Sequence, residues 1–283
     1  MTFTMVTPDA MLGGYLRLVL NQLGAAGFAV RAHRLTELDW DRLSQMYTHL
    51  DDPPPSSGDE GELPKVVMER LYRLAPACIL ILEGTAEAML ALKGATRPAE
   101  AAPGTIRAGG EHLIFNFVHC PDDAASAAIE LAYLVGPEDA KALWASPGTS
   151  LDQLHMCVPA YSGWEAISFP MVANRLRSRF VERLEAEQAL PLLVAERQQL
   201  LTLRSAAERL HVGQAASPAI HRALVAAAAG DAVFTAGLEA LAELYKLPGR
   251  RDQAPLVALR ERGIYLSELE QVTLHAHARA FGA

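Results

Sequence analysis

The sequence predicts a chain in two parts, a mixed fold of strands and helices followed by an all-helical part. Up to about Val135, short apolar runs alternate with segments whose apolar residues recur at helical spacing, which favours helices packed on a sheet. Beyond that point, strand-like runs give way to alanine- and leucine-rich segments interrupted by prolines. With 283 residues, 51% of them hydrophobic, the chain is long enough for two domains.

The elements of the first part are expected in a regular order. Strands are expected over residues 3–6, 28–35, 77–82 and 113–118, and helices over residues 12–25, 38–50, 65–74, 86–91 and 123–134. Asp39 and Asp123 stand where a side-chain oxygen can cap the first turn of a helix. A polar insert, residues 53–64, and a long loop before the last strand complete this part.

The second part shows signals of helices without a repeat of constant period. An apolar stripe recurs every four residues at Val172, Leu176, Phe180 and Leu184. Three pairs have the spacing of a capping box: Ser150 with Gln153, Ser205 with Glu208, and Ser267 with Glu270. Because this part contains no recognisable nucleophile or phosphate loop, we interpret it as an interaction or regulatory module. Tyr161 and Trp164 pack in its core or mark an interface.

A histidine at a predicted strand end is the principal candidate for chemistry. His119 follows the apolar run 113–118 and precedes Pro121-Asp122-Asp123, which is typical of a turn and a helix start. A neutral imidazole there can attack a terminal phosphoryl group and hold it covalently. Taken alone, the residue is more often a surface histidine. Upstream motifs reverse that preference: Gly94-Ala95-Thr96, Pro98, Pro103 to Arg107, and Asn116.

These motifs, in this order and spacing, resemble the nucleoside diphosphate kinase family. The resemblance extends from about Met5 to about Leu134, roughly half of the chain. Weaker matches lie along the same stretch: Thr7-Pro8-Asp9, Leu23 to Phe28, Tyr47 and Glu130. The resemblance implies an α+β fold, a ferredoxin-like four-stranded antiparallel sheet with helices. We therefore expect a kinase-like domain over residues 1–136 and an all-α domain over residues 137–283.

The resemblance also implies a role for each matching residue. His119 becomes phosphorylated on one ring nitrogen, Glu130 hydrogen-bonds the other, and Tyr47 packs beside the ring. Thr96 and Arg107 contact phosphates, because a guanidinium offers donors matched to phosphate oxygens. Asn116 binds the sugar hydroxyl or a phosphate. Outside the resemblance, Glu130 and Arg107 would be ordinary surface charges, and Asn116 and Tyr47 ordinary packing residues.

Several positions depart from the family pattern. Thr7 and Leu90 stand where the family has basic residues, Pro121 stands where it has serine, and the base-clamping segment is replaced by the insert 53–64, which has no aromatic residue. Each departure removes a contact to the nucleotide. Arg97 and Lys93 flank the Gly-Ala-Thr motif and are candidates to replace the missing positive charge. Alternatively, both are solvated.

Composition limits the partners. The net charge is −8, and nearly all of the acidic excess precedes Val135, so nucleic acid is not expected as a partner. The expected ligands are nucleoside di- and triphosphates, carried as their Mg²⁺ complexes. No dedicated metal site is expected, since His155-Met156-Cys157 and His275-Ala276-His277 lack suitable spacing. The three cysteines, Cys78, Cys120 and Cys157, indicate a reducing compartment.

The sequence thus predicts a soluble cytoplasmic enzyme without a membrane segment. It moves the terminal phosphoryl group of a nucleoside triphosphate to a diphosphate through phospho-His119. Two alternatives stay open: a degenerate nucleotide sensor or scaffold that acts through the helical half, and a phosphohistidine that passes its group to another acceptor. The resemblance implies a homo-oligomer, and the helical half is a candidate for binding a protein partner.

Overall fold

The computed structural model describes residues 1–47, 64–148 and 263–280, together with some of the residues between 168 and 239. The chain divides into two compact units, one made of residues 1–58 and 62–165 and the other of residues 59–61 and 166–283. Each unit is described here by itself. The expected domain boundary after residue 136 stays a prediction.

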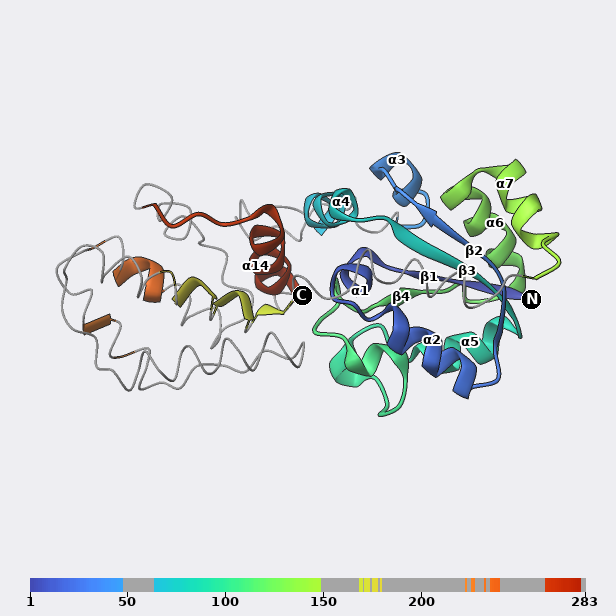
Figure 1. Cartoon of the computed structure of the whole chain (residues 1–283), viewed down its shortest axis with the longest axis horizontal. Coiled ribbons are helices and arrows are strands. Elements are labelled where there is room, and N and C mark those ends of the chain that lie inside the picture. Colours follow the sequence, from blue (N-terminus) through green and yellow to red (C-terminus); the bar gives the residue numbers. More distant parts are fainter. Residues whose placement is uncertain are drawn as a thin grey trace, which may run out of the picture. The chain divides into compact units, whose positions relative to one another are not determined.

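A four-stranded antiparallel sheet forms the centre of the first unit (Figure 1). Its strands are β1 (Thr2–Val6), β2 (Ala29–Thr36), β3 (Ala77–Glu83) and β4 (Val118–His119), in the order β2-β3-β1-β4. β1 pairs with β3 and β4, and β2 pairs with β3, all antiparallel. The expected sheet is therefore confirmed.

Helices connect and cover the strands. They are α1 (Pro8–Leu12), α2 (Leu16–Ala25), α3 (Trp40–Leu43), α4 (Pro64–Leu74), α5 (Ala86–Lys93), α6 (Ala124–Val135) and α7 (Pro137–Trp144), with short 3-10 turns η2 (Pro98–Glu100) and η3 (Ile106–Gly109). Both expected caps are present. Asp39 accepts a hydrogen bond from the Arg42 amide at 3.0 Å, and Asp123 accepts one from the Ser126 amide at 2.7 Å.

Three of the expected elements are corrected by the structure. Among the described residues, the helix expected over 38–50 is limited to α3, Trp40–Leu43, and a turn follows it. The helix over 12–25 is interrupted, because Gly14 takes a positive φ of 73° and α2 begins only at Leu16. The strand over 113–118 is wrong except for its last residue. Phe117 takes a φ of 73°, which no strand accommodates, and the amides of Ile114 and Phe115 donate to the His112 ring instead of a neighbouring strand.

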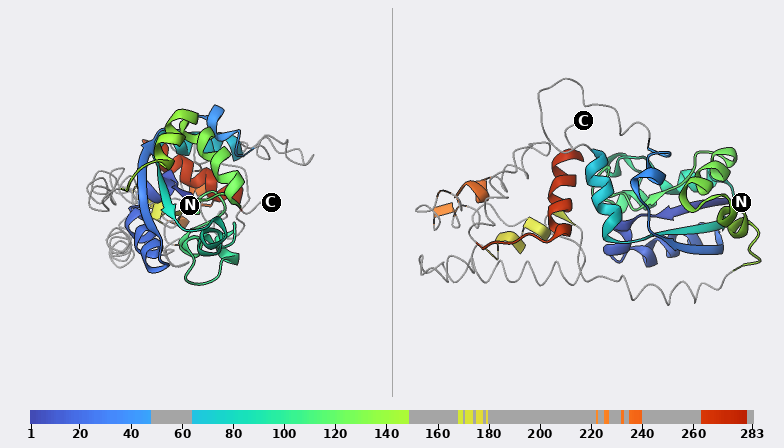
Figure 2. Two further views of the ribbon diagram at one scale, coloured as in Figure 1. Left: turned by 90° about the vertical axis from the view of Figure 1, so that its right-hand side faces the viewer. Right: turned by 90° about the horizontal axis from the view of Figure 1, so that it is seen from above.

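The sheet carries a hydrophobic core on each face, because alternate residues of a strand point to opposite sides. Figure 2 shows the helices on both sides of the strands. One core joins the strands to α2 and α5 and contains Leu20, Leu80 and Met89. The other joins them to α3, α4 and α6 and contains Met5, Tyr72 and Leu131.

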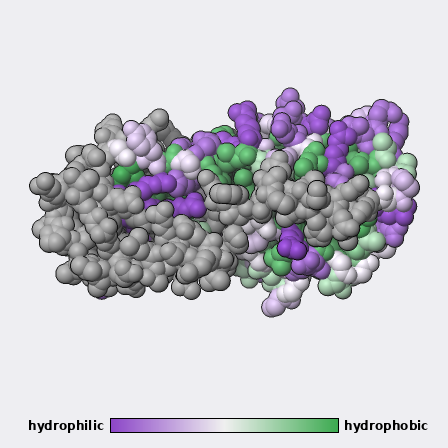
Figure 3. Space-filling view, in the orientation of Figure 1, coloured by the Kyte–Doolittle hydropathy of each residue, from purple (hydrophilic) through white to green (hydrophobic). Residues whose placement is uncertain are grey.

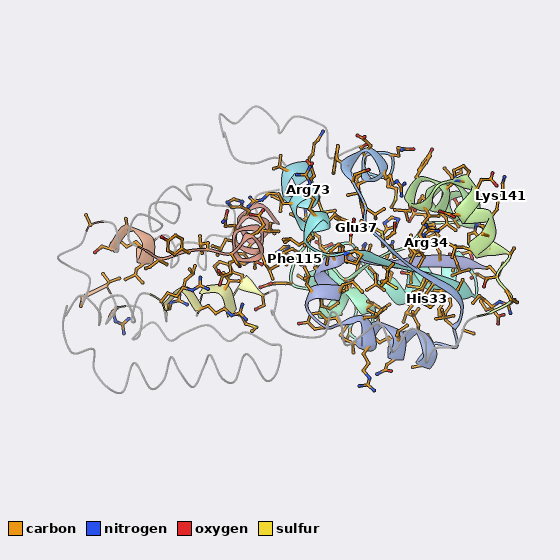
Figure 4. All side chains as sticks on the ribbon, turned by 45° about the horizontal axis from the view of Figure 1, so that its top comes forward. His33, Arg34, Glu37, Arg73, Phe115 and Lys141 are labelled. Carbon is orange, nitrogen blue, oxygen red and sulfur yellow. The ribbon has the colours of Figure 1, made fainter. Side chains whose placement is uncertain are left out.

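Polar contacts hold α7 beside the edge strand β2. Arg34 on β2 forms an ion pair with Asp139 on α7 at 2.8 Å, and the Ser146 hydroxyl donates to the Arg31 carbonyl at 3.3 Å. Arg34 and Lys141 lie at this side of the unit in Figure 4. Hydrophilic residues gather over α3 and α7 on the face shown in Figure 3.

In the second unit, α14 (Glu268–Ala280) packs against helical residues between 169 and 179. Phe169 stacks on His277 at 3.8 Å, and Arg179 donates to both carboxylate oxygens of Glu270 at 2.7 and 2.8 Å. The capping box of Ser267 and Glu270 is confirmed, with reciprocal bonds of 2.9 and 3.2 Å.

Within the stripe expected in this unit, Val172 and Leu176 are buried. Other expectations fall on residues outside the described set: Ser150, Gln153, His155, Cys157, Tyr161, Trp164, Phe180, Leu184, Ser205, Glu208 and the insert up to residue 63. Within the described ranges, no helix combines the length and the apolar composition needed to cross a bilayer.

Candidate active site

His119 is the last residue of β4, the short edge strand next to β1. It lies opposite Met5 in the antiparallel register, and its carbonyl oxygen accepts a hydrogen bond from the Thr4 hydroxyl at 2.9 Å. The backbone of the histidine is therefore held from β1, while its side chain is 17% exposed. A partly exposed imidazole on a fixed backbone can meet a ligand without losing its position.

Glu130 fixes one nitrogen of this imidazole. Its Oε2 lies 2.7 Å from Nε2 of His119, and the carboxylate is 21% exposed. Because an ionised carboxylate only accepts hydrogen bonds, we assign the proton to Nε2. The lone pair is then on Nδ1, which makes this nitrogen the nucleophile of the neutral ring.

Tyr47 lies edge-on to the same ring, with 5.8 Å between the ring centroids. Burial raises the pKa of Tyr47 to about 12. The Tyr47 hydroxyl therefore stays protonated at neutral pH. His119, Glu130 and Tyr47 are thus brought together as the sequence predicts, although each comes from a different element.

Arg107, on η3, is buried next to the histidine but does not contact it directly. Its Nε and Nη2 donate to the carbonyl oxygen of Val118 at 3.1 and 2.8 Å. Burial lowers the pKa of this guanidinium, and the nearby Tyr47, Cys120 and Asp9 act in the opposite direction. The positive charge of Arg107 is thus held at the peptide of Val118, the residue before the nucleophile.

Lys93 ends α5 and is 7% exposed. It lies close enough to Cys120, the residue after His119, to act on the pKa of its thiol. Burial raises the pKa of this thiol, and Lys93 and Arg107 offset part of that rise. A second cation therefore acts on the residue that follows the histidine. Cys78 and Cys120 are both free thiols.

The remaining expected contacts lie on the loop between α5 and β4. Asn116 is buried and its side-chain amide donates to the Leu113 carbonyl at 2.8 Å. Thr96 is exposed, and Arg97 is half-exposed with Glu100 4.0 Å away. The structure records no contact of these three described residues with the His119 ring. Their roles stay predictions.

The departures from the expected pattern lie on buried or partly buried positions. Thr7 is 6% exposed and its amide donates to the Phe117 carbonyl at 3.0 Å. Leu90 packs against the core on the α5 side of the sheet, and Pro121 is buried. Neither Thr7 nor Leu90 offers a charge to a ligand.

Asp9 is a residue of this site that the sequence analysis did not single out. It is 1% exposed, and its Oδ2 accepts a hydrogen bond from the Phe117 amide at 3.0 Å. Burial raises the pKa of this carboxyl from 3.8 to about 6. Its signal in the sequence is an acidic residue in the first turn after an apolar strand, in Thr7-Pro8-Asp9.

Comparisons with known proteins agree on the first half of the chain. A family model described as nucleoside diphosphate kinase matches residues 1–140. Nucleoside diphosphate kinases of two strains of Streptococcus thermophilus are 32% identical over 144 residues, which cover 48% of this chain and 97% of each relative.

Solved structures give the same coverage. A nucleoside diphosphate kinase family protein from Babesia bovis is 28% identical, with 48% of this chain and 88% of that chain covered and a TM-score of 0.41. A halophilic nucleoside diphosphate kinase from Halobacterium salinarum, in complex with CDP, is 27% identical, with 47% and 84% covered and a TM-score of 0.40.

Proposed function

The first half of this chain belongs to the nucleoside diphosphate kinase family, and from that premise we propose that it transfers a phosphoryl group between nucleotides through His119. The donor is a nucleoside triphosphate and the acceptor a nucleoside diphosphate. The observation that carries the proposal is the 2.7 Å contact between Nε2 of His119 and Glu130, which leaves Nδ1 as the free nucleophile.

In the first half-reaction, Nδ1 forms a bond to the γ-phosphorus, and the bond from that phosphorus to the bridging oxygen breaks. The nucleoside diphosphate leaves with the electron pair of that bond. The imidazolium formed on His119 keeps its proton on Nε2, where the Glu130 carboxylate stabilises the positive charge. In the second half-reaction, a terminal oxygen of another diphosphate attacks the phosphorus, and Nδ1 is released.

Positive charge beside the transferring group comes from Arg107. Its Nε and Nη2 hold the Val118 carbonyl, so the guanidinium is fixed next to the nucleophile before the ligand arrives. Such preorganised charge stabilises a developing anion more than a mobile one. Lys93 adds a further positive charge behind Cys120. Mg²⁺ would be held by the phosphate oxygens of the nucleotide and would neutralise part of their charge.

A specific observation favours a second function, a nucleotide sensor that does not turn over. Thr7 is buried and Leu90 is partly buried where the family has basic residues, and Lys93 interacts with Cys120. Fewer cations then reach the phosphates. In this version the helical half would carry the signal to a protein partner, and assembly of the chain into homo-oligomers would belong to either version.

The deciding experiment labels the full-length protein with ATP carrying ³²P on the γ-phosphate, in the presence of Mg²⁺. His119→Ala is compared with His33→Ala, a histidine of the edge strand β2. We expect acid-labile label on the wild type and on His33→Ala, none on His119→Ala, and transfer of the label to added GDP. Label that stays on the protein after GDP is added would indicate another acceptor. Nucleotide binding without any label would favour the sensor function.

A further inference from the structure

The backbone immediately before the histidine makes a tight turn. Phe117 has a φ of 73°, the one positive value of a non-glycine residue in the described part of the chain. The Val118 amide donates to the Asn116 carbonyl at 2.9 Å, which closes a three-residue γ-turn around Phe117. A γ-turn with positive φ is rare and strained, so it persists only when its surroundings hold it.

Three contacts hold this turn, and all come from the N-terminal segment. The Asp9 carboxylate accepts from the Phe117 amide at 3.0 Å, and the Thr7 amide donates to the Phe117 carbonyl at 3.0 Å. The Phe117 ring stacks on Tyr15, with 4.4 Å between the centroids. Among these contacts, the bond to Asp9 is the one made by a carboxylate, and it holds the amide of the turn residue itself.

The turn determines where β4 begins. Directly after it, the Val118 carbonyl receives the two bonds from Arg107, and the His119 carbonyl receives the bond from Thr4. If Phe117 relaxed to an extended conformation, both carbonyls would change direction, and the His119 ring would leave Glu130.

We propose that Asp9 is a positioning residue for His119: its carboxylate holds Phe117 in the left-handed turn that brings the histidine ring to Glu130 and the Val118 carbonyl to Arg107. The catalytic consequence rests on the proposed function. The geometric consequence does not, since it concerns the free protein.

The surroundings of Asp9 make this contact sensitive to pH. Burial raises the pKa of Asp9 to about 6, while the bond from the Phe117 amide acts in the opposite direction. The charged and titratable groups that act on it are Arg107 on η3, Tyr15 before α2, Tyr47 after α3 and Tyr72 on α4. A protonated carboxyl is a weaker acceptor than a carboxylate, so the hold on the Phe117 amide weakens as the pH falls below about 6.

The first test follows the backbone by NMR of the full chain without nucleotide. In the wild type, the Phe117 amide proton should shift upfield as the pH falls, with a midpoint near 6. Asp9→Asn keeps an acceptor oxygen but does not titrate, so this transition should disappear. Asp39→Asn, which alters another carboxylate–amide contact at the N-cap of α3, should leave it unchanged. A Phe117 amide that titrates equally in Asp9→Asn would overturn the proposal.

The second test measures the histidine. In Asp9→Ala, two-bond ¹H–¹⁵N correlations of the His119 ring should show loss of the single Nε2-protonated tautomer, and phosphohistidine formation should slow at least about tenfold with KM changed less than kcat. An unchanged ring spectrum and rate in folded Asp9→Ala would refute the role. If the wild type takes no label, the proposed function fails, and the NMR spectra still decide the role of Asp9.

A third comparison identifies the path of the effect. Glycine adopts positive φ without strain, so the turn in Phe117→Gly should depend less on the Asp9 carboxylate. Asp9→Ala should therefore lower the rate of phosphohistidine formation by a smaller factor in a Phe117→Gly background than in the wild type. It should also change the tautomer of the His119 ring less. Equal factors in the two backgrounds would mean that Asp9 acts by a route other than the turn. This comparison also applies if Asp9→Ala alone unfolds, since the relaxed turn needs no anchor.

Discussion

The carbonyl oxygen of Val118 accepts two hydrogen bonds from the guanidinium of Arg107, 3.1 Å from Nε and 2.8 Å from Nη2. This arrangement ties a buried cation to the peptide that leads into His119. The arginine therefore stabilises the backbone before His119, in addition to its proposed contact with phosphate.

Replacing this arginine by lysine should lower the rate of phosphorylation of His119, although lysine keeps the positive charge. In Arg107→Lys, a single ammonium group cannot reproduce the two bonds to Val118, and the charge moves away from the site. We expect phosphohistidine formation to fall about 100-fold, as for other losses of a preorganised charge. Rapid-quench labelling measures the rate. Arg31→Lys, at an exposed ion pair with Glu83, is the control and should stay near wild type. A rate within a factor of three would contradict the assignment.

Replacing the orienting carboxylate by its amide separates charge from hydrogen bonding. In Glu130→Gln, the amide oxygen can still accept a hydrogen bond from the Nε2–H group. It carries no charge, however, to stabilise the imidazolium that forms on phosphorylation. The same labelling assay should show a loss of about 10- to 100-fold, corresponding to roughly 1.4–2.7 kcal/mol in the barrier. Glu138→Gln, on the exposed surface of α7, provides the comparison. Full activity in Glu130→Gln would mean that the carboxylate only fills space.

The buried carboxyl of Asp9 should make the protein less stable as the pH rises. Its pKa is about 6 in the folded chain against 3.8 unfolded, so the folded state binds this proton more tightly. The associated stability is complete below pH 3.8 and is lost as the pH passes 6. Relative to Asp9→Asn, the wild type should lose roughly 3 kcal/mol between these limits.

Urea unfolding of the wild type and Asp9→Asn, from pH 4 to pH 7.5, measures this difference. Only the difference between the two proteins is used, because other groups titrate in the same range and cancel in it. A difference that does not change with pH would show that Asp9 is not buried as described.

Two glycines of the loop before β4 form a matched pair. Gly94 and Gly104 both have positive φ, 83° and 90°. A Cβ on Gly94 would lie 2.4 Å from Oγ1 of Thr105, whereas one on Gly104 would meet nothing within 4 Å. Alanine at either site should cost about 1–2 kcal/mol in backbone strain. Gly94→Ala should cost more and should also weaken nucleotide binding, since the loop must move. Thermal unfolding and nucleotide titration compare the two variants, and equal effects would exclude a role for the contact with Thr105.

The ion pair of the second unit gives a test that leaves the first unit intact. Glu270 is 2% exposed and binds Arg179 with both oxygens while it caps α14. Glu270→Ala leaves the guanidinium without its partner and the helix without its cap, so we expect a loss of about 3 kcal/mol in that unit. Calorimetry should show a lower unfolding temperature for the second unit and an unchanged unfolding temperature for the first. Loss of His119 labelling in this variant would reveal a dependence of the site on the helical half.

The sequence allowed three of the four strands and most helices to be predicted, because their apolar residues recur with the period of the element that they form. The antiparallel arrangement of the sheet was implied by the resemblance to the family. The prediction failed where a contact from elsewhere in the chain overrides the local pattern. The run Leu113 to Val118 has the composition of a strand, yet Asp9 and Thr7 bend it at Phe117. Nothing local to that run indicates the turn.

The candidate site shows the same division. His119 and Glu130 were paired from a motif because they are close in the sequence and in space. The position of Arg107 on a backbone carbonyl and that of Lys93 near a thiol depend on three-dimensional packing, so the motif predicted the residues but not their partners. Asp9 was missed for the same reason.

The contacts around His119 also differ in how early the growing chain can form them. Glu130 follows the histidine by 11 residues, whereas the contacts to Asp9 and Thr4 join residues 108 and 115 positions apart. Because closing a long loop costs more entropy than closing a short one, the strand-to-helix unit that carries the histidine and the glutamate can assemble before β1 pairs with β4. Pairing of β1 with β4 would then be the folding step that completes the surroundings of the nucleophile.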